Sequence, residues 1–172
     1  SNSSYTFLSG YKYVDMLIAG GGGAGGTNSA GGGASGTLLY VKNLMLSNLS
    51  NKTISYNLAK TSSGDGNSTM ITLEGETITV TGGGKGGSNG FNGSNGGHGG
   101  HGGSLNETSI ISTLTKYVSN VSDIAIANNG GGSGGYWYNP EGYGYAAGSG
   151  ATMSNSGKDG SRTTAGGQVN NG

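Results

Sequence analysis

The amino-acid sequence predicts a mainly β fold, in which short antiparallel strands frame a bundle of polyglycine II helices with loops of Ser, Asn and Thr. Three observations predict this fold. Glycine supplies 41 of the 172 residues, against a usual share of about 7%. The glycine gathers in three blocks, over residues 20–36, 82–103 and 130–172. The segments between these blocks have the β-branched and aromatic character of strands.

Four segments between the glycine blocks predict the strands. Residues 5–19 are rich in aromatic and β-branched side chains and end in a short apolar run, and residues 37–49 are mostly apolar. Residues 53–59 alternate weakly between apolar and polar side chains. Residues 68–81 alternate regularly on both sides of a Glu-Gly pair at 74–75, which predicts a β-hairpin with its turn at that pair.

The segment over residues 107–127 carries two signals. Apolar residues recur at helical spacing from Ile110 to Val121, whereas the Ser/Thr content and β-branching favour a strand. We expect a short helix followed by a strand over 123–127. The chain is then one domain over 1–172, made of a strand and polyglycine framework (5–103), a short helix or strand insert (104–127) and an aromatic, glycine-rich C-terminal part (128–172).

Ordering this much glycine requires an unusual kind of packing. Fixing a glycine costs roughly 0.5–1 kcal/mol more than fixing an alanine, which is on the order of 20–40 kcal/mol for 41 residues. A helix of the polyproline II type has three residues per turn and no internal hydrogen bonds, so its backbone groups can pair with neighbouring segments. Without Cβ atoms such helices pack backbone against backbone. The alternative is a small β-sandwich with tight glycine turns.

Composition excludes several classes of function. Only 9% of the residues are charged and the net charge is zero, so phosphate neutralisation of a nucleic acid is not expected. No apolar run approaches the ~18 residues of a membrane span. The chain contains no cysteine, which excludes disulfides and thiolate metal sites.

The order of blocks along the N-terminal part matches a known pattern. An aromatic-led strand leads into VDMLIAGGGGAGG, then come GGGASG, an apolar strand, a polar hairpin and TVTGGGKGGSNGFNGSNGGHGGHGG. This pattern, over residues 5–103, resembles the glycine-rich domains of bacteriophage tail-fibre proteins and of some giant-virus surface proteins. The resemblance implies polyglycine sandwiches whose intervening loops contact a host receptor. The chain departs from it where Asn, Ser and Lys replace much of the usual Pro, Val and Ala.

The best candidate receptor site is an aromatic segment over residues 136–145. It holds the chain's only Trp and only Pro between flanking glycines, which makes burial of all its rings unexpected. Tyr and Trp supply rigid, amphipathic contact area and dominate recognition hot spots. An equal alternative is that the rings cover glycine backbone or form a subunit contact. The candidate receptor-binding residues are Tyr136, Trp137, Tyr138, Tyr143 and Tyr145.

Other motifs are better explained by composition than by chemistry. The G-x-G-x-x-G over 21–26 lacks a following helix, and the two G-x-S-x-G matches lack the acid and histidine that a nucleophile elbow requires. His98 and His101 would lie about 9 Å apart in a polyproline II helix, too far to share zinc within one chain, although copies on a symmetry axis could converge. N-x-S/T sequons occur at Asn2, Asn48, Asn51, Asn67, Asn92, Asn106 and Asn120.

The sequence therefore predicts a non-enzymatic viral attachment module of a tail fibre or surface fibre, at the virion surface or extracellular. Its expected partner is a host-cell glycan or protein, with a homotrimer or another virion protein as a further partner. No cofactor, metal, nucleic acid or membrane insertion is expected. The alternative is a structural, self-assembling subunit of a viral capsid or extracellular fibre. A third interpretation, an ice-binding surface, is disfavoured because the Thr residues have no regular spacing.

Overall fold

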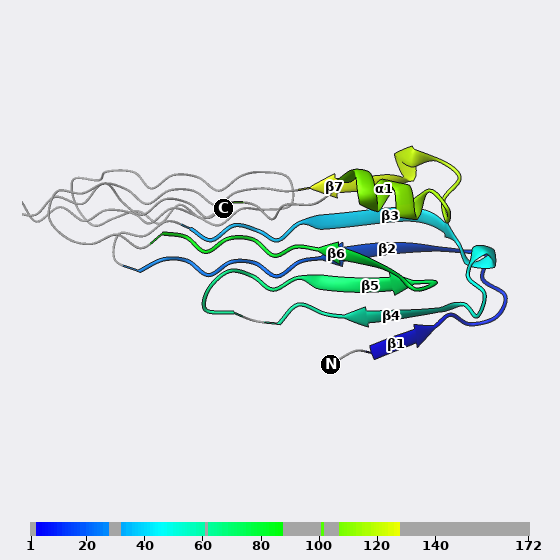
Figure 1. Cartoon of the computed structure of the whole chain (residues 1–172), viewed down its shortest axis with the longest axis horizontal. Helices are drawn as coiled ribbons and strands as arrows, with labels where there is room; N and C mark the ends of the chain where they lie inside the picture. The colour runs from blue at the N-terminus through cyan, green and yellow to red at the C-terminus, as the bar shows by residue number, and fades with distance from the viewer. Residues whose placement is uncertain (1–2, 28–31, 61, 88–100, 102–106, 128–172) are drawn as a thin grey trace, which may run out of the picture.

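The computed structural model describes residues 3–27, 32–60, 62–87, 101 and 107–127. Within these residues the fold is mainly β, with seven strands in two antiparallel sheets and one α-helix (Figure 1). The elements are β1 (Ser3–Thr6), β2 (Tyr13–Ala19), β3 (Leu38–Met45), the 3₁₀ turn η1 (Leu46–Asn48), β4 (Thr53–Asn57), β5 (Thr69–Leu73), β6 (Glu76–Val80), α1 (Glu107–Leu114), the 3₁₀ turn η2 (Val121–Asp123) and β7 (Ile124–Ala127).

The strands form a four-stranded sheet in the order β1-β4-β5-β6 and a three-stranded sheet in the order β2-β3-β7. The predicted hairpin over 68–81 is confirmed as β5 and β6, paired from Thr69 with Val80 to Leu73 with Glu76. Its turn has Glu74 at φ 48° and Gly75 at φ 81°. Two positive φ values match the right-handed twist of the flanking strands, which is why a short Glu-Gly turn suits this hairpin.

The two sheets and the helix bury one apolar core. Every second residue of β5 and β6 faces this core, as the alternation in the sequence predicts. Helix α1 adds Ile110 and Leu114, which lie four residues apart on one helical face. The core consists of Met16, Ile18, Leu39, Val41, Leu44, Leu46, Leu49, Ile54, Ile71, Leu73, Ile78, Val80, Ile110, Leu114, Tyr117 and Val118.

Two sequence-based expectations are refined by the structure. The run over 5–19 is divided into β1 and β2, which belong to different sheets, and Gly10 between them has a φ of 100°. A residue in that left-handed region cannot continue a strand, so the chain turns there. Over 107–127 the expected helix and strand are both present, as α1 and β7. No helix among the described residues is long and apolar enough to cross a membrane.

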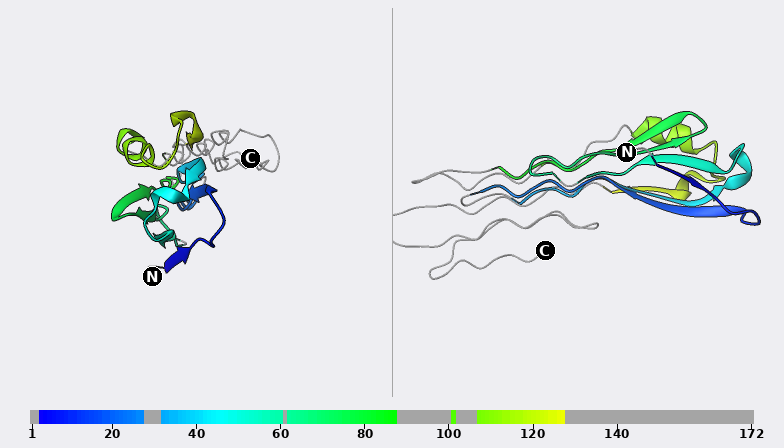
Figure 2. Two further views of the ribbon diagram at one scale, coloured as in Figure 1. Left: turned by 90° about the vertical axis from the view of Figure 1, so that its right-hand side faces the viewer. Right: turned by 90° about the horizontal axis from the view of Figure 1, so that it is seen from below.

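Four strands continue beyond the sheets as extended, glycine-containing segments. Strand β2 runs into residues 20–27, residues 32–37 lead into β3, residues 62–68 lead into β5, and β6 runs into residues 81–87. These four glycine segments leave the same end of the sheets and run side by side (Figures 1 and 2). The strands therefore set the positions from which the glycine segments begin.

Backbone hydrogen bonds join these segments at every third residue. In segment 20–27, the N–H groups of Gly20 and Gly23 donate to segment 32–37, and those of the residues that follow each of them donate to segment 62–68. The bonds run from Gly20 to Thr37, Gly23 to Ala34, Gly21 to Asn67 and Ala24 to Gly64, with N···O distances of 2.8–2.9 Å. A β-ladder uses alternate residues on one side of a strand, so this three-residue repeat distinguishes the glycine segments from the sheets.

Segment 81–87 completes the array and connects the two sheets. It donates to 20–27, runs parallel to it, and accepts from the antiparallel segment 32–37. These bonds are Gly83 to Gly21 (2.9 Å), Gly86 to Ala24 (2.8 Å), Ala34 to Gly84 (3.0 Å) and Thr37 to Thr81 (2.9 Å). Because 20–27 and 81–87 extend strands of different sheets, their hydrogen bonds tie the sheets together.

The absence of a side chain, not a special backbone angle, explains why glycine is needed here. Among the described glycines only Gly10 and Gly75 have positive φ. A Cβ atom on Gly23 would lie within 3.0 Å of the carbonyls of Gly83 and Gly84. Such separations are not tolerated between real atoms, so the segments can approach this closely only where Cβ is missing.

Candidate functional site

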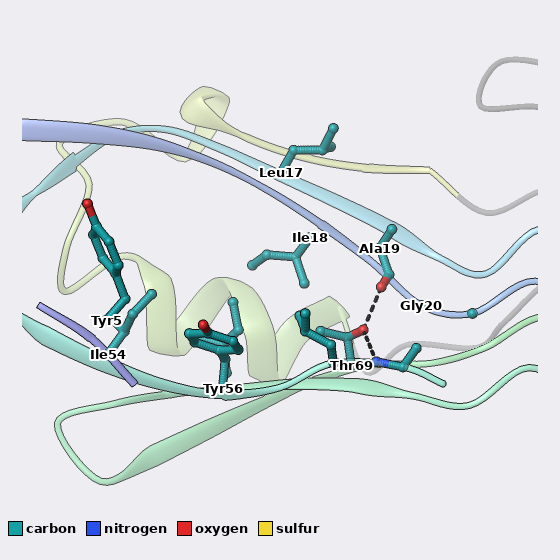
Figure 3. A pocket seen from close by; sticks show the side chains of 12 residues that line it. Tyr5, Leu17, Ile18, Ala19, Gly20, Ile54, Tyr56 and Thr69 are labelled. Atoms are coloured by element: carbon teal, nitrogen blue, oxygen red, sulfur yellow. Dashed lines mark hydrogen bonds between the residues drawn. The ribbon is translucent and has the colours of Figure 1, made fainter. Parts of the chain in front are cut away.

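An apolar cleft lies at the edge where the two sheets meet and is here named the inter-sheet cleft. It has a volume of about 660 Å³. Strand β2 forms one wall, and β1, β4 and β5 contribute the other. Figure 3 shows Tyr5, Ile54 and Tyr56 rising from the four-stranded sheet toward Ile18 of β2. The lining residues are Tyr5, Leu17, Ile18, Ala19, Gly20, Gly21, Ile54, Tyr56, Leu58, Ala59, Thr69 and Ile71.

The inter-sheet cleft is an opening onto the core. Its floor is formed by the buried Ile18 and Ile71, which are also core residues. Its rim carries Tyr5, Leu17 and Leu58, whose exposed fractions are 51%, 60% and 61%. The cleft is open because β1 and β2, which form this edge, belong to different sheets and are not paired with each other.

Thr69 provides the polar group at the end of the cleft nearest the glycine segments. Its hydroxyl donates to the carbonyl of Ala19 at 2.6 Å and accepts from the amide of Ala59 at 3.0 Å (Figure 3). Both bonds are made to backbone, and the side chain is buried. Thr69 therefore joins the end of β2 to the other sheet, and its hydroxyl is already satisfied without a ligand.

A second groove, here named the tyrosine groove, adjoins the cleft and shares Tyr5 with it. It has a volume of about 360 Å³. Tyr5 and Phe7 contact each other edge to face, with ring centroids 5.1 Å apart and planes at 78°, a favourable arrangement for aromatic rings. Tyr11 is 64% exposed. The groove is lined by Tyr5, Phe7, Leu8, Tyr11, Tyr13, Val14 and Leu46.

The surfaces of the two grooves are apolar and aromatic. No Asp, Glu, His, Lys or Arg is among the described residues that line either groove. Within the described ranges no group of three His, Cys, Asp or Glu side chains is placed to hold a metal ion. What the two grooves do offer is apolar area together with tyrosine rings, which combine a flat apolar face with a polar tip.

Ionisable groups with shifted pKa values lie near α1. The side-chain hydrogen bond from Lys116 lowers the pKa of Glu76, and the two groups form an exposed ion pair. Burial raises the pKa of Tyr117, with a further contribution from the nearby negative charge of Glu74. Neither Glu76 nor Tyr117 lines the two grooves.

The receptor residues predicted from the sequence lie outside the described residues. This applies to Tyr136, Trp137, Tyr138, Tyr143 and Tyr145, and also to His98. His101 is described, and its carbonyl accepts a hydrogen bond of 2.7 Å from the amide of Gly84. The backbone of His101 thus joins the glycine array.

Sequence reasoning missed the two grooves. The residues that line them come from strands far apart in the chain, and only the meeting of the two sheets brings them together. One signal was available, because Tyr5, Phe7, Tyr11 and Tyr13 lie close together at the N-terminal end. Comparison with protein-family models, curated proteins and solved structures gave no match to this chain.

Proposed function

We propose that this chain is a non-enzymatic attachment module of a viral tail fibre or surface fibre, which binds a glycan or protein on the host cell from the virion surface. The observation that carries the proposal is the pair of tyrosine-lined grooves, which are open to solvent. They lie at the edge of two β-sheets that are joined by hydrogen bonds between their glycine segments. Tyrosine is favoured in recognition sites because it presents a large, rigid contact area with few rotatable bonds.

We also propose that the glycine segments are polyglycine II helices. The hydrogen bonds repeat every third residue, which is the repeat of this helix. Segment 20–27 pairs with three neighbours, antiparallel with 32–37 and 62–68 and parallel with 81–87. A rigid scaffold of this kind favours binding, because residues that are fixed beforehand lose less conformational entropy when a ligand binds.

Two aromatic surfaces then compete for the role of receptor contact. One is the tyrosine groove with the adjoining inter-sheet cleft. The other is the segment over 136–145, whose Tyr136, Trp137, Tyr138, Tyr143 and Tyr145 have the composition of a recognition loop. Variants in each surface separate the two.

The test measures binding of the purified chain to a printed array of bacterial and eukaryotic surface glycans and to intact candidate host cells. Tyr11→Ala removes an exposed ring from the tyrosine groove, and Trp137→Ala removes the tryptophan ring of the segment over 136–145. Val121→Ala is the control, because Val121 is an exposed apolar residue outside both grooves. Loss of a hot-spot ring costs about 2 kcal/mol or more, roughly a thirtyfold weaker Kd. Binding by the parent chain that neither ring variant weakens would refute the site assignment, and no binding to any glycan or cell would refute the function.

A further inference from the structure

One backbone edge of strand β2 faces the inter-sheet cleft. In an antiparallel pair, residues whose N–H and C=O groups face the partner strand alternate with residues whose groups face away from it. The amide of Gly20 donates to the carbonyl of Thr37, directly before β3, so Gly20 and, two residues earlier, Ile18 face β3. The backbone groups of Leu17 and Ala19 therefore point to the opposite side of β2.

A hydrogen bond at Ala19 shows where that side lies. The carbonyl of Ala19 accepts from the hydroxyl of Thr69 at 2.6 Å, and Thr69 belongs to β5 of the other sheet (Figure 3). Leu17 and Ala19 both line the inter-sheet cleft, whose volume of about 660 Å³ is the space beside them. The edge therefore presents the N–H and C=O of Leu17 and the N–H of Ala19 to an occupant of the cleft.

The surface below this edge is apolar and uncharged. The buried Ile18 and Ile71 form the floor, with Ile54 and Tyr56 beside them. None of the described lining residues carries a charge, so the cleft offers no partner to a phosphate or a carboxylate. The hydroxyl of Thr69 already bonds two backbone groups. A glycan placed on this floor would leave most of its hydroxyls without a hydrogen bond, which is unfavourable.

We propose that the inter-sheet cleft binds an extended peptide segment of the host-surface protein, which adds a strand to the edge of β2. Complementarity of charge and hydrogen bonding selects this occupant. An edge with N–H and C=O groups at a two-residue repeat matches another extended backbone, and an uncharged apolar floor matches an uncharged apolar side chain. The proposal rests on the attachment function and narrows its ligand from a glycan or protein to a protein.

The register of the added strand follows from the edge. In an antiparallel pairing, the two peptide residues opposite Leu17 and Ala19 exchange main-chain hydrogen bonds with them. The residue between these two stands opposite Ile18 and turns its side chain into the cleft, since side chains alternate along a strand. The β-bulge between Val14 and Met16 ends the regular edge on one side. The bound segment is therefore short, and its inward side chain determines specificity.

Amide hydrogen exchange tests this geometry on the full chain. In the free chain, the amides of Leu17 and Ala19 are expected to exchange faster than those of Ile18 and Gly20, which bond to the β3 side. The probe is a set of capped seven-residue synthetic peptides in which Thr alternates with Val, Leu, Phe or Tyr. Binding of a peptide from this set is expected to slow exchange at Leu17 and Ala19 about tenfold and to leave Gly20 unchanged.

Two methylated forms of the bound peptide are matched to each other. Methyl groups on the Thr amides, which face β2, are expected to weaken binding about tenfold or more, the change that follows from loss of one or two backbone hydrogen bonds. Methyl groups on the amides of the apolar residues, which face away, are expected to leave the Kd unchanged. The two forms contain the same side chains, so they separate strand pairing from apolar contact.

Leu17→Pro tests the same bond from the side of the protein. It removes an N–H group that faces the cleft and not β3, which is the place where an edge strand tolerates Pro. The variant is expected to lose peptide binding about tenfold or more, whereas Val121→Ala, at an exposed position outside the cleft, retains it. Should Leu17→Pro fail to fold, the two methylated peptides test the bond on the parent chain.

Several results would overturn the proposal. It is overturned if no peptide of the set slows exchange at Leu17 and Ala19, or if both methylated forms bind equally. It is also overturned if a neutral oligosaccharide or an uncharged lipid slows exchange at these two amides and the peptides do not. Host-cell binding that survives in folded Leu17→Pro refutes the strand pairing and leaves the attachment function standing. Peptide binding by a chain that binds no host cell supports the pairing and refutes the attachment function.

Discussion

Neighbouring glycines in segment 20–27 are expected to respond in opposite directions to the same substitution. A methyl group at Gly23 would point at the carbonyls of Gly83 and Gly84, within 3.0 Å. A methyl group at Gly22 would point outward, with its nearest contact at 3.8 Å. Because both residues have φ outside the left-handed region, Gly23→Ala and Gly22→Ala differ only in what the new methyl group meets.

The magnitude follows from the bonds around Gly23. Its methyl group would push 81–87 away from 20–27, which weakens the bonds from Gly83 to Gly21, from Gly86 to Ala24 and from Ala34 to Gly84. Three backbone bonds, each worth about 0.5–1.5 kcal/mol net, give a loss of about 1.5–4.5 kcal/mol. The smaller entropy of the unfolded alanine chain offsets about 0.4–1 kcal/mol of it. The net destabilisation expected for Gly23→Ala is about 0.5–4 kcal/mol.

The matched variant Gly22→Ala keeps only the stabilising effect of a less flexible unfolded chain. Gly22→Ala loses no described hydrogen bond, so it is expected to stabilise the fold by about 0.4–1 kcal/mol. For a chain of this length each kcal/mol moves the Tm by about 2–4 °C. Thermal melts followed by far-UV circular dichroism measure both changes. Equal Tm values for Gly23→Ala and the parent chain, or a marked loss in Gly22→Ala, would refute the packing argument.

Three further predictions concern the sheets. Thr69→Val removes a buried hydroxyl that bonds two backbone groups and is expected to cost about 1–3 kcal/mol in denaturant unfolding, whereas the exposed Thr79→Val is nearly neutral; equal effects would contradict the role of Thr69. Lys116→Met is expected to raise the pKa of Glu76 toward its ordinary value, as measured by an NMR titration. In the parent chain, the stability that this ion pair contributes is present above the ordinary pKa of Glu76 and is lost as pH falls through its lowered pKa. In an ultraviolet titration, the hydroxyl of Tyr117 is expected to have a higher pKa than free tyrosine. Its contribution to stability is therefore complete below about pH 10 and is lost as pH rises through the raised pKa.

The elements that could be predicted from the sequence are those governed by local patterns. The hairpin of β5 and β6 follows from alternation on both sides of a Glu-Gly turn, and both side-chain period and turn chemistry act within a few residues. Helix α1 and strand β7 agree with the expectation for residues 107–127, although the Ser/Thr content and β-branching there also favoured a strand, so the local pattern did not decide between them. The division of residues 5–19 into two strands was missed, because the sheet that each half joins depends on distant partners.

The membership of the glycine array was only partly predictable. Residues 62–68 contain just two glycines and lie outside the glycine-rich blocks, yet Gly64 and Asn67 accept bonds from segment 20–27. The array needs a missing Cβ only where two backbones meet, so a segment with other residues at its outward positions can join it. The polyglycine II conformation of these segments remains a proposal that rests on their three-residue repeat.

The candidate site illustrates the same limit. The five aromatic residues predicted over 136–145 lie outside the described residues, and the two grooves that the structure does show were not anticipated. Each groove is assembled from residues that are distant in sequence, and Leu17 or Leu58 alone has no feature that marks it as part of a rim.

By itself the sequence determined the mainly β character and the hairpin, since these depend on side-chain period and turn chemistry, and it favoured a short helix and glycine segments that pair through their backbones. Only the tertiary structure decided which segments pair, that the array joins two separate sheets, and that the core stays open between β1 and β2. The physical reason is that backbone hydrogen bonds between glycine segments are nearly identical from one segment to the next. Their partners are therefore chosen by the strands that lead into them, and not by the glycines.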